Sequence, residues 1–433
     1  MSSHTVSDGL KSVIPEATLL VYSEPSDAYD VVIQFLSAEN LPKTDIIGYS
    51  DPYFIANIDH QITYTSSILP NTSSPKWDNE QWIVRNIPMT AKLSISLFDK
   101  DDEEPTDDYI GRIEILNIMN YHAPPGGHDI ISFAGNKHGQ FHLSIQSMQS
   151  SDETKRLPRY TFDGPCRYFR HDSYAIGRLT MLNADCVYST WKIPMRRISV
   201  YFPPYQRQHW NTHYRSAQVI FGKCPVSLLS KTTIKLTHKA LYGRTVKHNE
   251  NGHLNSADDL WKHVFVDKTT KRIKPSIYTY VIDNYTWRFS ETGGQFFTDF
   301  ASKHALLANG SEYVRYAGEF HIRPKNGWNH WNETNDDSNE WEIVFDNGSG
   351  TYTPSKDLLN NLKELLLFNF PNLNVVTYDF KDPKLKKSVE ELKAAMEKYK
   401  SVTKALDQLV SHYLPKVPNI CDGTVRAENE DIR

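Results

Sequence analysis

The first regular pattern in the chain is an alternation of apolar and polar positions between Asp30 and Ser147. Short segments such as VVIQFL, LSISLFD and QFHLSIQ place apolar side chains at every second position, and turn residues separate them. A period of two is typical of strands with one buried face, and short strands at regular intervals are typical of an antiparallel sandwich. The pattern therefore predicts an antiparallel β-sandwich over residues 28–148.

A polar segment, residues 150–158 (SSDETKRLP), predicts a linker after the sandwich. The region that follows, residues 159–413, is richer in Tyr, Trp, Thr and Arg and contains the strand-like runs RRISVYF, QVIF, TYVIDNYTWRF, YAGEFHI and WEIVF. We predict a larger β-rich α+β domain here, so that the whole chain is mainly β. Residues 414–433 are expected to form a tail.

The period changes from two to that of a helix after Pro354. Leu358, Leu362 and Leu365 share one helical face, and the segment NVVTYDF that follows predicts a strand. A last helix is expected to begin at Asp382-Pro383, an N-cap residue followed by proline at the first helical position, and to end near Tyr413. Its nearly heptad apolar stripe favours packing on its own domain, with intermolecular coiling as the alternative.

Composition and charge limit the class of protein. The 433 residues are 39% hydrophobic and 23% charged, which is typical of folded soluble chains. No apolar run approaches the roughly 18 residues of a spanning helix, and the start lacks the pattern of a signal peptide, so a cytoplasmic protein is expected. Residues 1–150 carry 8 Lys+Arg and 20 Asp+Glu, a net charge of -12, which leaves +8 for residues 151–433. The two parts are thus suited to different surroundings.

Five aspartates in two predicted loops are the strongest chemical signal. Asp45 and Asp51 lie in LPKTDIIGYSDPYF, whereas Asp99, Asp101 and Asp108 lie in FDKDDEEPTDDYIG. Calcium binds six to eight oxygens in a flexible geometry, so several loop carboxylates suit it better than they suit magnesium. Like charges placed together also repel one another unless a cation lies between them. The two loops therefore predict a calcium site.

Several motifs around these aspartates resemble those of the C2 domain, the calcium- and phospholipid-binding sandwich, over about residues 28–148. They are the Leu-Pro opening, Ser-Asp-Pro-Tyr at 50–53, Pro-Lys-Trp-Asp-Asn at 75–79, and Asp-Tyr-Ile-Gly at 108–111. The resemblance implies Ca²⁺ as cofactor, a phospholipid membrane surface as partner, and five ligands: Asp45, Asp51, Asp99, Asp101 and Asp108. The interval from Asp101 to Asp108 is one residue longer than usual, so Asp107 is an alternative fifth ligand.

The resemblance also implies how the domain contacts a membrane. Ile46 and Ile47 beside the first aspartate are candidates for insertion into the lipid interface. Glu103 and Glu104 stand where membrane binders often carry basic or apolar residues, and the segment TYTSSIL lacks a lysine cluster for phosphoinositides. The lipid headgroup therefore remains open. The alternative is a family member that kept the fold and lost the metal, although retention of all five aspartates favours metal binding.

The second region contains no recognisable catalytic motif. His209 and His213 are four residues apart, but their flanks predict loop and strand, which argues against a zinc site. The segment 288–321 is the best place for a pocket, because it contains Glu291, Asp299, Lys303, His304, Arg315, Glu319 and His321. The region is faintly similar to the second half of uncharacterised C2-containing proteins of lower eukaryotes, which implies no activity.

The stretch Lys231–Lys274 is basic, with 10 Lys+Arg against 4 Asp+Glu, and it suits anionic lipid better than nucleic acid, for which no fold signature is present. The sequence thus favours a calcium-dependent peripheral membrane protein. An enzyme of unknown reaction brought to lipid by the same module, and an adaptor that binds a protein partner through the second domain, are the alternatives.

Overall fold

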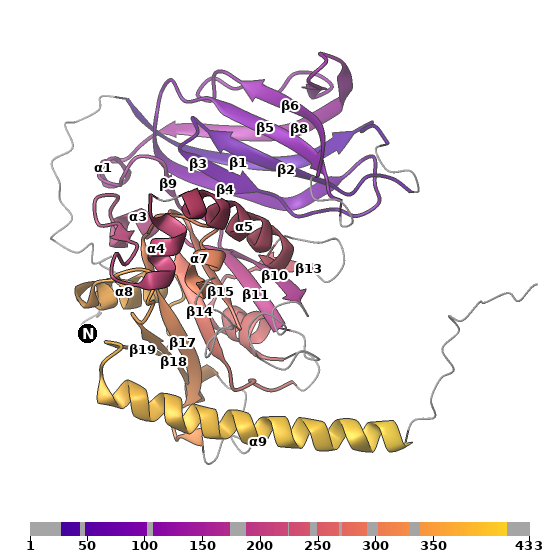
Figure 1. Cartoon of the computed structure of the whole chain (residues 1–433). Helices are drawn as coiled ribbons and strands as arrows, with labels where there is room; N and C mark the ends of the chain where they lie inside the picture. The colour runs from indigo at the N-terminus through magenta and orange to yellow at the C-terminus, as the bar shows by residue number, and fades with distance from the viewer. Residues whose placement is uncertain are drawn as a thin grey trace, which may run out of the picture.

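The protein consists of two β-sheet bodies stacked on one another, with a long helix across the far end of the second (Figure 1). The computed structural model describes residues 27–43, 48–101, 107–173, 188–223, 225–242, 249–267, 271–291, 302–328 and 338–413. The architecture is mainly β, as the alternation of apolar positions predicts.

The N-terminal body is a nine-stranded antiparallel sheet in the order β3-β2-β5-β6-β7-β8-β1-β4-β9. A single residue pair, Arg112 with Ile131, joins β6 to β7, so the ladder is almost interrupted there and its two halves face one another. The strands are β1 (Ala28–Glu39), β2 (Pro52–Ile58), β3 (Ile62–Thr65), β4 (Lys76–Pro88), β5 (Leu93–Asp99), β6 (Asp108–Ile115), β7 (His128–Ile131), β8 (Lys137–Gln149) and β9 (Thr161–Phe162).

The core of this body lies between the two halves. The ring of Phe54 from β2 lies 4.5 Å from that of Phe35 on β1 and 5.4 Å from that of Phe141 on β8, measured between centroids. Alternate residues of β5 are buried, as period-two patterning requires. The structure requires a glycine at position 111 of the Asp-Tyr-Ile-Gly motif, because a Cβ there would lie 2.9 Å from the carbonyl oxygen of Ile131.

The second body is built on an eight-stranded sheet in the order β13-β10-β11-β15-β14-β17-β18-β19, antiparallel except for the parallel pair β18–β19. All six residues of β14, the segment IYTYVI, are buried, because both faces of the sheet are covered. The strands are β10 (Arg167–Ser173), β11 (Tyr188–Pro194), β13 (Asn249–His253), β14 (Ile277–Ile282), β15 (Thr286–Ser290), β17 (Tyr316–Pro324), β18 (Trp341–Asp346) and β19 (Val375–Tyr378), with a separate pair β12 (Gln208–His209) and β16 (Tyr313–Val314).

The C-terminal elements agree with the sequence prediction. β18 leads through α8 to β19, and the last helix begins at Pro383 and ends at Tyr413. Leu392 and Ala395 of that helix are buried in the main core, so the described part of its apolar stripe packs on its own domain. The helices are α1 (Asp152–Lys155), α3 (Ile198–Tyr201), α4 (Arg215–Phe221), α5 (Pro225–Tyr242), α6 (Ala257–Leu260), α7 (Lys303–Leu307), α8 (Leu359–Asn369) and α9 (Pro383–Tyr413), with short turns η2 (Trp261–Phe265), η4 (Ser338–Glu340) and η5 (Lys356–Leu358).

Two of the strand predictions are wrong. RRISVYF contains the helical turn α3, and QVIF forms the end of helix α4. Periodicity cannot separate a short buried strand from one buried turn of helix, because four apolar residues in a row fit both. α4 buries Ala217, Ile220 and Phe221 in a small cluster with α5 and α7, and this packing decides the helical form.

The segment expected to be a linker is ordered and joins the two bodies closely. Residues 152–155 form α1, Leu157 is buried in the second core, and β9 pairs with β4 at the edge of the N-terminal sheet. Farther along the contact, Arg167 of β10 forms an ion pair with Glu80 of β4, and both side chains are almost fully buried. The two bodies therefore share a buried polar contact.

Candidate calcium edge of the sandwich

Three of the predicted ligands lie at one end of the N-terminal sheet, where the strands β2, β5 and β6 begin or end. We call these strand ends the calcium edge. Asp99 ends β5, Asp108 begins β6, and the two residues are direct partners in the antiparallel register. Pro52, the first residue of β2, is the partner of Asp99 on its other side, so Asp51 is also adjacent. Residues directly opposite one another have Cβ atoms about 5 Å apart, and like charges in such pairs are destabilising. This edge therefore concentrates negative charge at three adjacent strand ends.

A short chain of hydrogen bonds holds this edge. The backbone N–H of Asp51 donates to Asp99 Oδ1 at 2.5 Å, and the backbone N–H of Asn71 donates to Asp51 Oδ1 at 2.6 Å. Asn71 Oδ1 in turn accepts the backbone N–H of Tyr49 at 2.8 Å. Asn71 has a positive φ of 53°, a conformation that asparagine tolerates better than most residues. This positioning role could not be predicted from the sequence, because an asparagine in a polar loop gives no distinctive signal.

Asp107, the alternative fifth ligand, is bonded elsewhere. Its carboxylate accepts a hydrogen bond from the Tyr53 hydroxyl at 2.8 Å and forms an ion pair with Lys100 Nζ at 2.7 Å. Lys239 of α5 lies 4.0 Å from the same carboxylate. Successive residues near a strand project to opposite sides, and Asp107 accordingly lines a cavity between the two bodies, whereas Asp108 is exposed.

The other predicted site residues divide into two groups. Asp45, Ile46 and Ile47 lie outside the described residues, as do Glu103 and Glu104, whereas Asp101 is described and half-buried just after β5. Within the described part of the chain, no three His, Cys, Asp or Glu side chains are grouped closely enough to hold a metal ion together. The chemical type of the predicted ligands nevertheless fits a hard cation, since they are carboxylates on adjacent strand ends.

The strand order, the opposed half-sheets and the aspartates at one edge define a C2-type sandwich. Residues 29–123 match the family model of the C2 domain, and this part of the chain is a C2 domain. Tricalbin-1 of Saccharomyces cerevisiae is 38% identical over 141 residues, which are 30% of this chain and 11% of that protein. A protein of Arabidopsis thaliana named calcium-dependent lipid-binding protein is 30% identical over 71 residues, 16% of this chain and 14% of its own length.

Two further similarities are to a ligase and to a solved plant structure. The E3 ubiquitin-protein ligase Nedd-4 of Drosophila melanogaster is 31% identical over 125 residues, 27% of this chain and 12% of the ligase. A solved C2 domain of plant extended synaptotagmin 1 has a TM-score of 0.26 and 14% identity, and the match covers 30% of this chain and all of that domain. The chain thus spans only 11–14% of the length of the three relatives.

The segment TYTSSIL, which lacks a lysine cluster, lies against the second body. Ser67 Oγ donates a hydrogen bond to Asn251 Oδ1 of β13 at 3.1 Å, and it accepts one from Arg167 Nη2 at the same distance. Thr65 and Ile68 of this segment line cavities shared with residues of the second body. This surface of the C2 domain is therefore used for contact within the chain.

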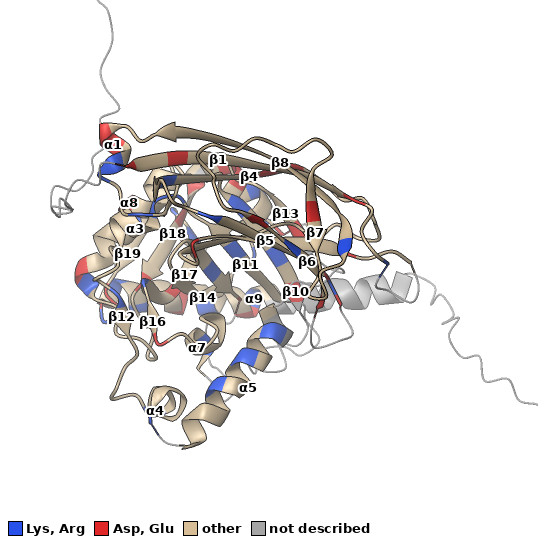
Figure 2. Ribbon diagram, turned by 90° about the horizontal axis from the view of Figure 1, so that it is seen from above, with Lys and Arg blue, Asp and Glu red and all other residues tan. Residues whose placement is uncertain are grey.

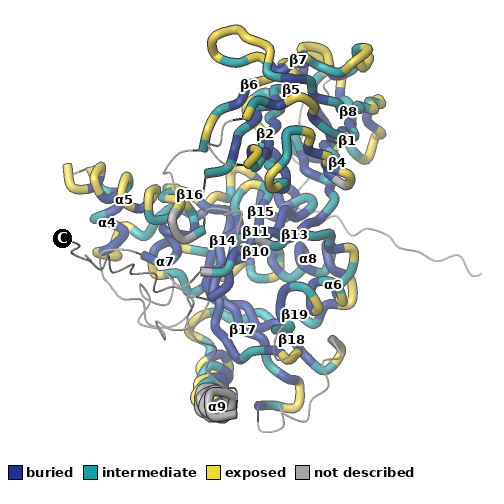
Figure 3. The backbone as a smooth tube through the Cα atoms, turned by 90° about the vertical axis from the view of Figure 1, so that its right-hand side faces the viewer, coloured by how far each residue is buried: buried dark blue, intermediate teal, exposed yellow. Residues whose placement is uncertain are grey.

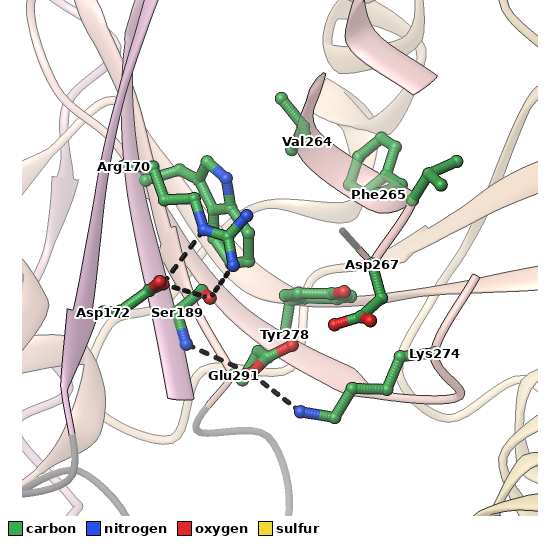
Figure 4. Close-up of a pocket in the computed structure, with 11 residues that line it drawn as sticks. Arg170, Asp172, Ser189, Val264, Phe265, Asp267, Lys274, Tyr278 and Glu291 are labelled. Carbon is green, nitrogen blue, oxygen red and sulfur yellow. Dashed lines mark hydrogen bonds and ion pairs between the residues drawn. The ribbon is translucent and has the colours of Figure 1, made fainter. Parts of the chain in front are cut away.

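The second body contains a polar cavity of about 260 Å³ between β10, β11, β14 and η2 (Figure 4). Ser189 Oγ donates to Asp172 at 2.6 Å, and Arg170 Nε donates to the same oxygen at 2.9 Å. On the opposite side, Lys274 Nζ lies 3.1 Å from Glu291 Oε2. These charged groups form opposite pairs, an arrangement typical of satisfied buried polar groups, so the cavity by itself assigns no reaction.

The other residues expected near a pocket in segment 288–321 do not converge on one site. Glu291 lines the cavity of Figure 4, but Lys303 pairs with Glu319, and Asp299 lies outside the described residues. His304 Nε2 contacts the carbonyl oxygen of Gly318 at 2.9 Å. Burial, with the charge of Lys303, lowers the pKa of His304 to about 3, so this imidazole is neutral at pH 7.

His321 and Arg315 are also buried within the second body. The His321 Nε2 atom lies 2.7 Å from Ser388 Oγ of α9, and burial followed by the charge of Arg323 lowers the pKa of His321 to about 3. Arg315 is buried, and burial together with the charge of Arg207 lowers its pKa to about 10. His321 therefore joins β17 to α9 through Ser388.

The histidine pair of HWNTH does not form a helical metal site. His209 belongs to β12, and its ring lies 5.0 Å from those of Trp210 and Tyr313, whereas His213 is exposed in the turn that follows. A strand followed by a turn cannot place residues four apart on one helical face. As for membranes, the helices in the described ranges include none that is long and apolar enough to span a bilayer.

Proposed function

We propose that this protein binds phospholipid membranes peripherally and in a calcium-dependent manner through its C2 domain. Asp45, Asp51, Asp99, Asp101 and Asp108 are the proposed calcium ligands, and the second domain has no assigned activity. The similarity to C2-containing relatives, one of them named a calcium-dependent lipid-binding protein, supports this function.

The observation that carries the proposal is the register at the strand ends. Asp99 faces Asp108 on one side and adjoins Asp51 on the other, and Asp99 itself is fully buried. Three carboxylates in adjacent positions repel one another in the absence of a cation, and a bound calcium ion would turn that repulsion into attraction. Rotation of the more exposed Asp51 and Asp108 side chains would direct their oxygens to a common point.

The assignment of the fifth ligand to Asp108 rests on the contacts of its neighbour. Asp107 is held by Tyr53 and Lys100, so its recruitment to a metal would break an ion pair of 2.7 Å that is only partly exposed. Asp108 is exposed and opposite Asp99. We therefore propose Asp108 as the ligand and Asp107 as part of the contact with α5.

Calcium would cancel the negative charge of the edge and so permit close approach of an anionic membrane. In this proposal Ile46 and Ile47 enter the lipid interface beside the metal. The protein would then reside in the cytoplasm and associate peripherally with a phospholipid surface when calcium rises. The alternatives of a lipid-targeted enzyme and of a protein adaptor concern the second domain and remain compatible with this role.

Calcium binding should be lost when two proposed ligands become neutral. In the Asp99→Asn, Asp101→Asn double variant, isothermal calorimetry should show no calcium heat, because each substitution removes a charged ligand of a hard cation. Asp107→Asn is the matched control on the same loop and should retain calcium binding. Loss of binding in the control with retention in the double variant would overturn the ligand assignment.

Membrane binding should follow calcium. The wild-type chain should sediment with phosphatidylserine-containing vesicles in calcium and remain in solution with a chelator, and Ile46→Ala, Ile47→Ala should weaken sedimentation on the order of tenfold because partial burial of two apolar side chains is lost. Equal sedimentation with and without chelator would contradict calcium dependence.

A further inference from the structure

Helix α5 is inverted in its distribution of apolar and polar residues. Its solvent side carries four aliphatic side chains, Val226, Leu228, Leu229 and Leu236, which are 54, 73, 69 and 63% exposed. Its buried side carries two serines, Ser227 and Ser230, at 2 and 1% exposure, beside the apolar Ile234. A surface helix whose outer side faces only water shows the opposite pattern, with polar residues on the outer side and apolar residues on the side that faces the core.

The packing of the helix is nevertheless defined. Ile234 lies in a cluster with Ala217, Ile220 and Phe221 of α4, and with residues of α7. His238 Nδ1 contacts the carbonyl oxygen of Leu306 at 2.6 Å. The exposed leucines therefore do not result from a helix that lacks contacts. Figure 3 shows α5 at the periphery of the molecule with exposed residues along its outer side.

The charge on α5 has one sign. The helix contains Lys231, Lys235 and Lys239 and no aspartate or glutamate, so blue bands alone mark it in Figure 2. Lys231 is paired with Glu312, whereas Lys235 is on the solvent side with the leucines. We define the outer face of α5 as Val226, Leu228, Leu229, Lys235, Leu236 and Lys239. Aliphatic residues interleaved with lysines suit an anionic lipid interface, where the methyl groups enter the acyl boundary and the ammonium groups meet phosphate.

The outer face is continuous with the calcium edge of the C2 domain. Lys239 Nζ lies 4.0 Å from Asp107, the residue before Asp108, and Lys235 and Lys239 line one cavity of about 490 Å³ together with Lys100 and Asp107. At 1.5 Å per residue, Leu229 lies about 15 Å along the helix from Lys239. A membrane held at the calcium edge would thus be within reach of the leucines.

We propose that the outer face of α5 is a second membrane-contacting element, which lies in the interface of an anionic bilayer beside the calcium edge. This inference rests on the proposed function and extends it to the second domain. Lys239 Nζ lies 4.0 Å from the Asp107 carboxylate, so α5 is adjacent to the C2 domain at this point. In this proposal both elements contact the same bilayer, and two linked contacts raise the affinity for it more than either contact alone.

The test compares Leu228→Ser, Leu229→Ser with wild type in the full-length chain. Sedimentation in saturating calcium uses vesicles with phosphatidylserine and phosphatidylcholine in about a 1:3 ratio. Vesicle affinity of the variant should fall on the order of tenfold, because partial burial of two leucines is lost. Its calcium affinity measured by calorimetry without vesicles should equal that of the wild type, which also verifies that the fold is intact. Unchanged vesicle affinity in the variant would overturn the proposal.

Two further variants separate a membrane from other occupants. Leu116→Ser is the matched control, since Leu116 is 66% exposed and follows β6 at the end opposite the calcium edge, about 25 Å away. It should bind vesicles like the wild type. Leu228→Phe, Leu229→Phe should bind vesicles at least as tightly, because aromatic side chains also enter a lipid interface. A wild-type dimer in solution that Leu228→Ser, Leu229→Ser dissociates would instead assign the face to a second copy.

Failure of this inference can be told apart from failure of the proposed function. If the wild type does not sediment with calcium, the calcium-dependent function fails, and α5 is then judged by calcium-free sedimentation at low salt. Binding under that condition that is lost in Leu228→Ser, Leu229→Ser would support the α5 proposal on its own. Absence of binding in every condition would overturn both.

Discussion

Replacement of Arg167 by alanine should lower the free energy of unfolding by about 3–5 kcal/mol, because it leaves a buried carboxylate without its counter-ion. Arg167 and Glu80 are 5 and 4% exposed, and Arg167 Nη2 also donates to Asn251 Oδ1 at 3.0 Å. Burial by itself would raise the pKa of Glu80, yet the charge of Arg167 and hydrogen bonds from Ser67 and Tyr64 lower it below its ordinary value. Urea unfolding followed by tryptophan fluorescence measures the effect.

The control for this prediction is an exposed ion pair. Arg112 and Glu114 are 59 and 50% exposed at their side chains, so Arg112→Ala should cost no more than about 0.5 kcal/mol. A double variant, Glu80→Leu with Arg167→Leu, should lose less than the sum of its single variants, because neither charge is then left buried alone. A loss below about 1 kcal/mol in Arg167→Ala would contradict a stabilising role of the pair.

Stability should fall as pH rises from about 4 to 7, in part because of Asp346. Burial, reinforced by the nearby charge of Glu319, raises the pKa of Asp346 to about 7 in the folded protein. In the unfolded chain this carboxyl ionises near its ordinary value of about 3.9. The unfolded state therefore releases its proton first, the folded state binds more protons across this window, and the free energy of unfolding decreases until both states are ionised.

The Asp346→Asn variant isolates this effect. The amide oxygen can still accept the backbone N–H groups of Gly348, at 2.7 Å, and of Glu319, at 3.1 Å. At pH 4 the free energy of unfolding of the variant should be close to that of the wild type. At pH 8 it should be higher by on the order of 2–4 kcal/mol, since one pKa unit corresponds to about 1.4 kcal/mol. Thermal unfolding at both pH values measures it. Asp129→Asn, at an exposed carboxyl, is the control, and a similar pH-dependent gain there would contradict the assignment to Asp346.

The organisation of the chain was largely predictable because it depends on local periodicity. Alternation between Asp30 and Ser147 predicted the sandwich, and Asp382-Pro383 predicted the start of α9, which the structure places at Pro383. The Asp-Tyr-Ile-Gly motif at 108–111 begins β6, where only the structure shows that a Cβ on Gly111 would lie too close to Ile131. The helices α3 and α4 were mistaken for strands because each contains too few apolar residues to show a period.

The roles of individual polar residues were less predictable. Asn71 holds Asp51 through its backbone N–H, a contact between residues 20 positions apart. Asp107 and Asp108 are neighbouring residues of the same type, so the sequence does not show which of them is the ligand. Their positions at the start of β6 distinguish them, because Asp107 pairs with Lys100 whereas Asp108 lies opposite Asp99. Strand register and side-chain direction, which decide these contacts, follow from long-range pairing rather than from local pattern.

The sequence by itself determined the C2 domain and its set of acidic residues, because short motifs and a period of two are local properties. The tertiary structure decided what surrounds them. It placed the segment TYTSSIL against the second body through Ser67 and Arg167, and it turned the leucines of α5 outward beside Asp107. These arrangements join residues 100 or more positions apart. The free energy of packing two bodies together, rather than any local preference, selects them.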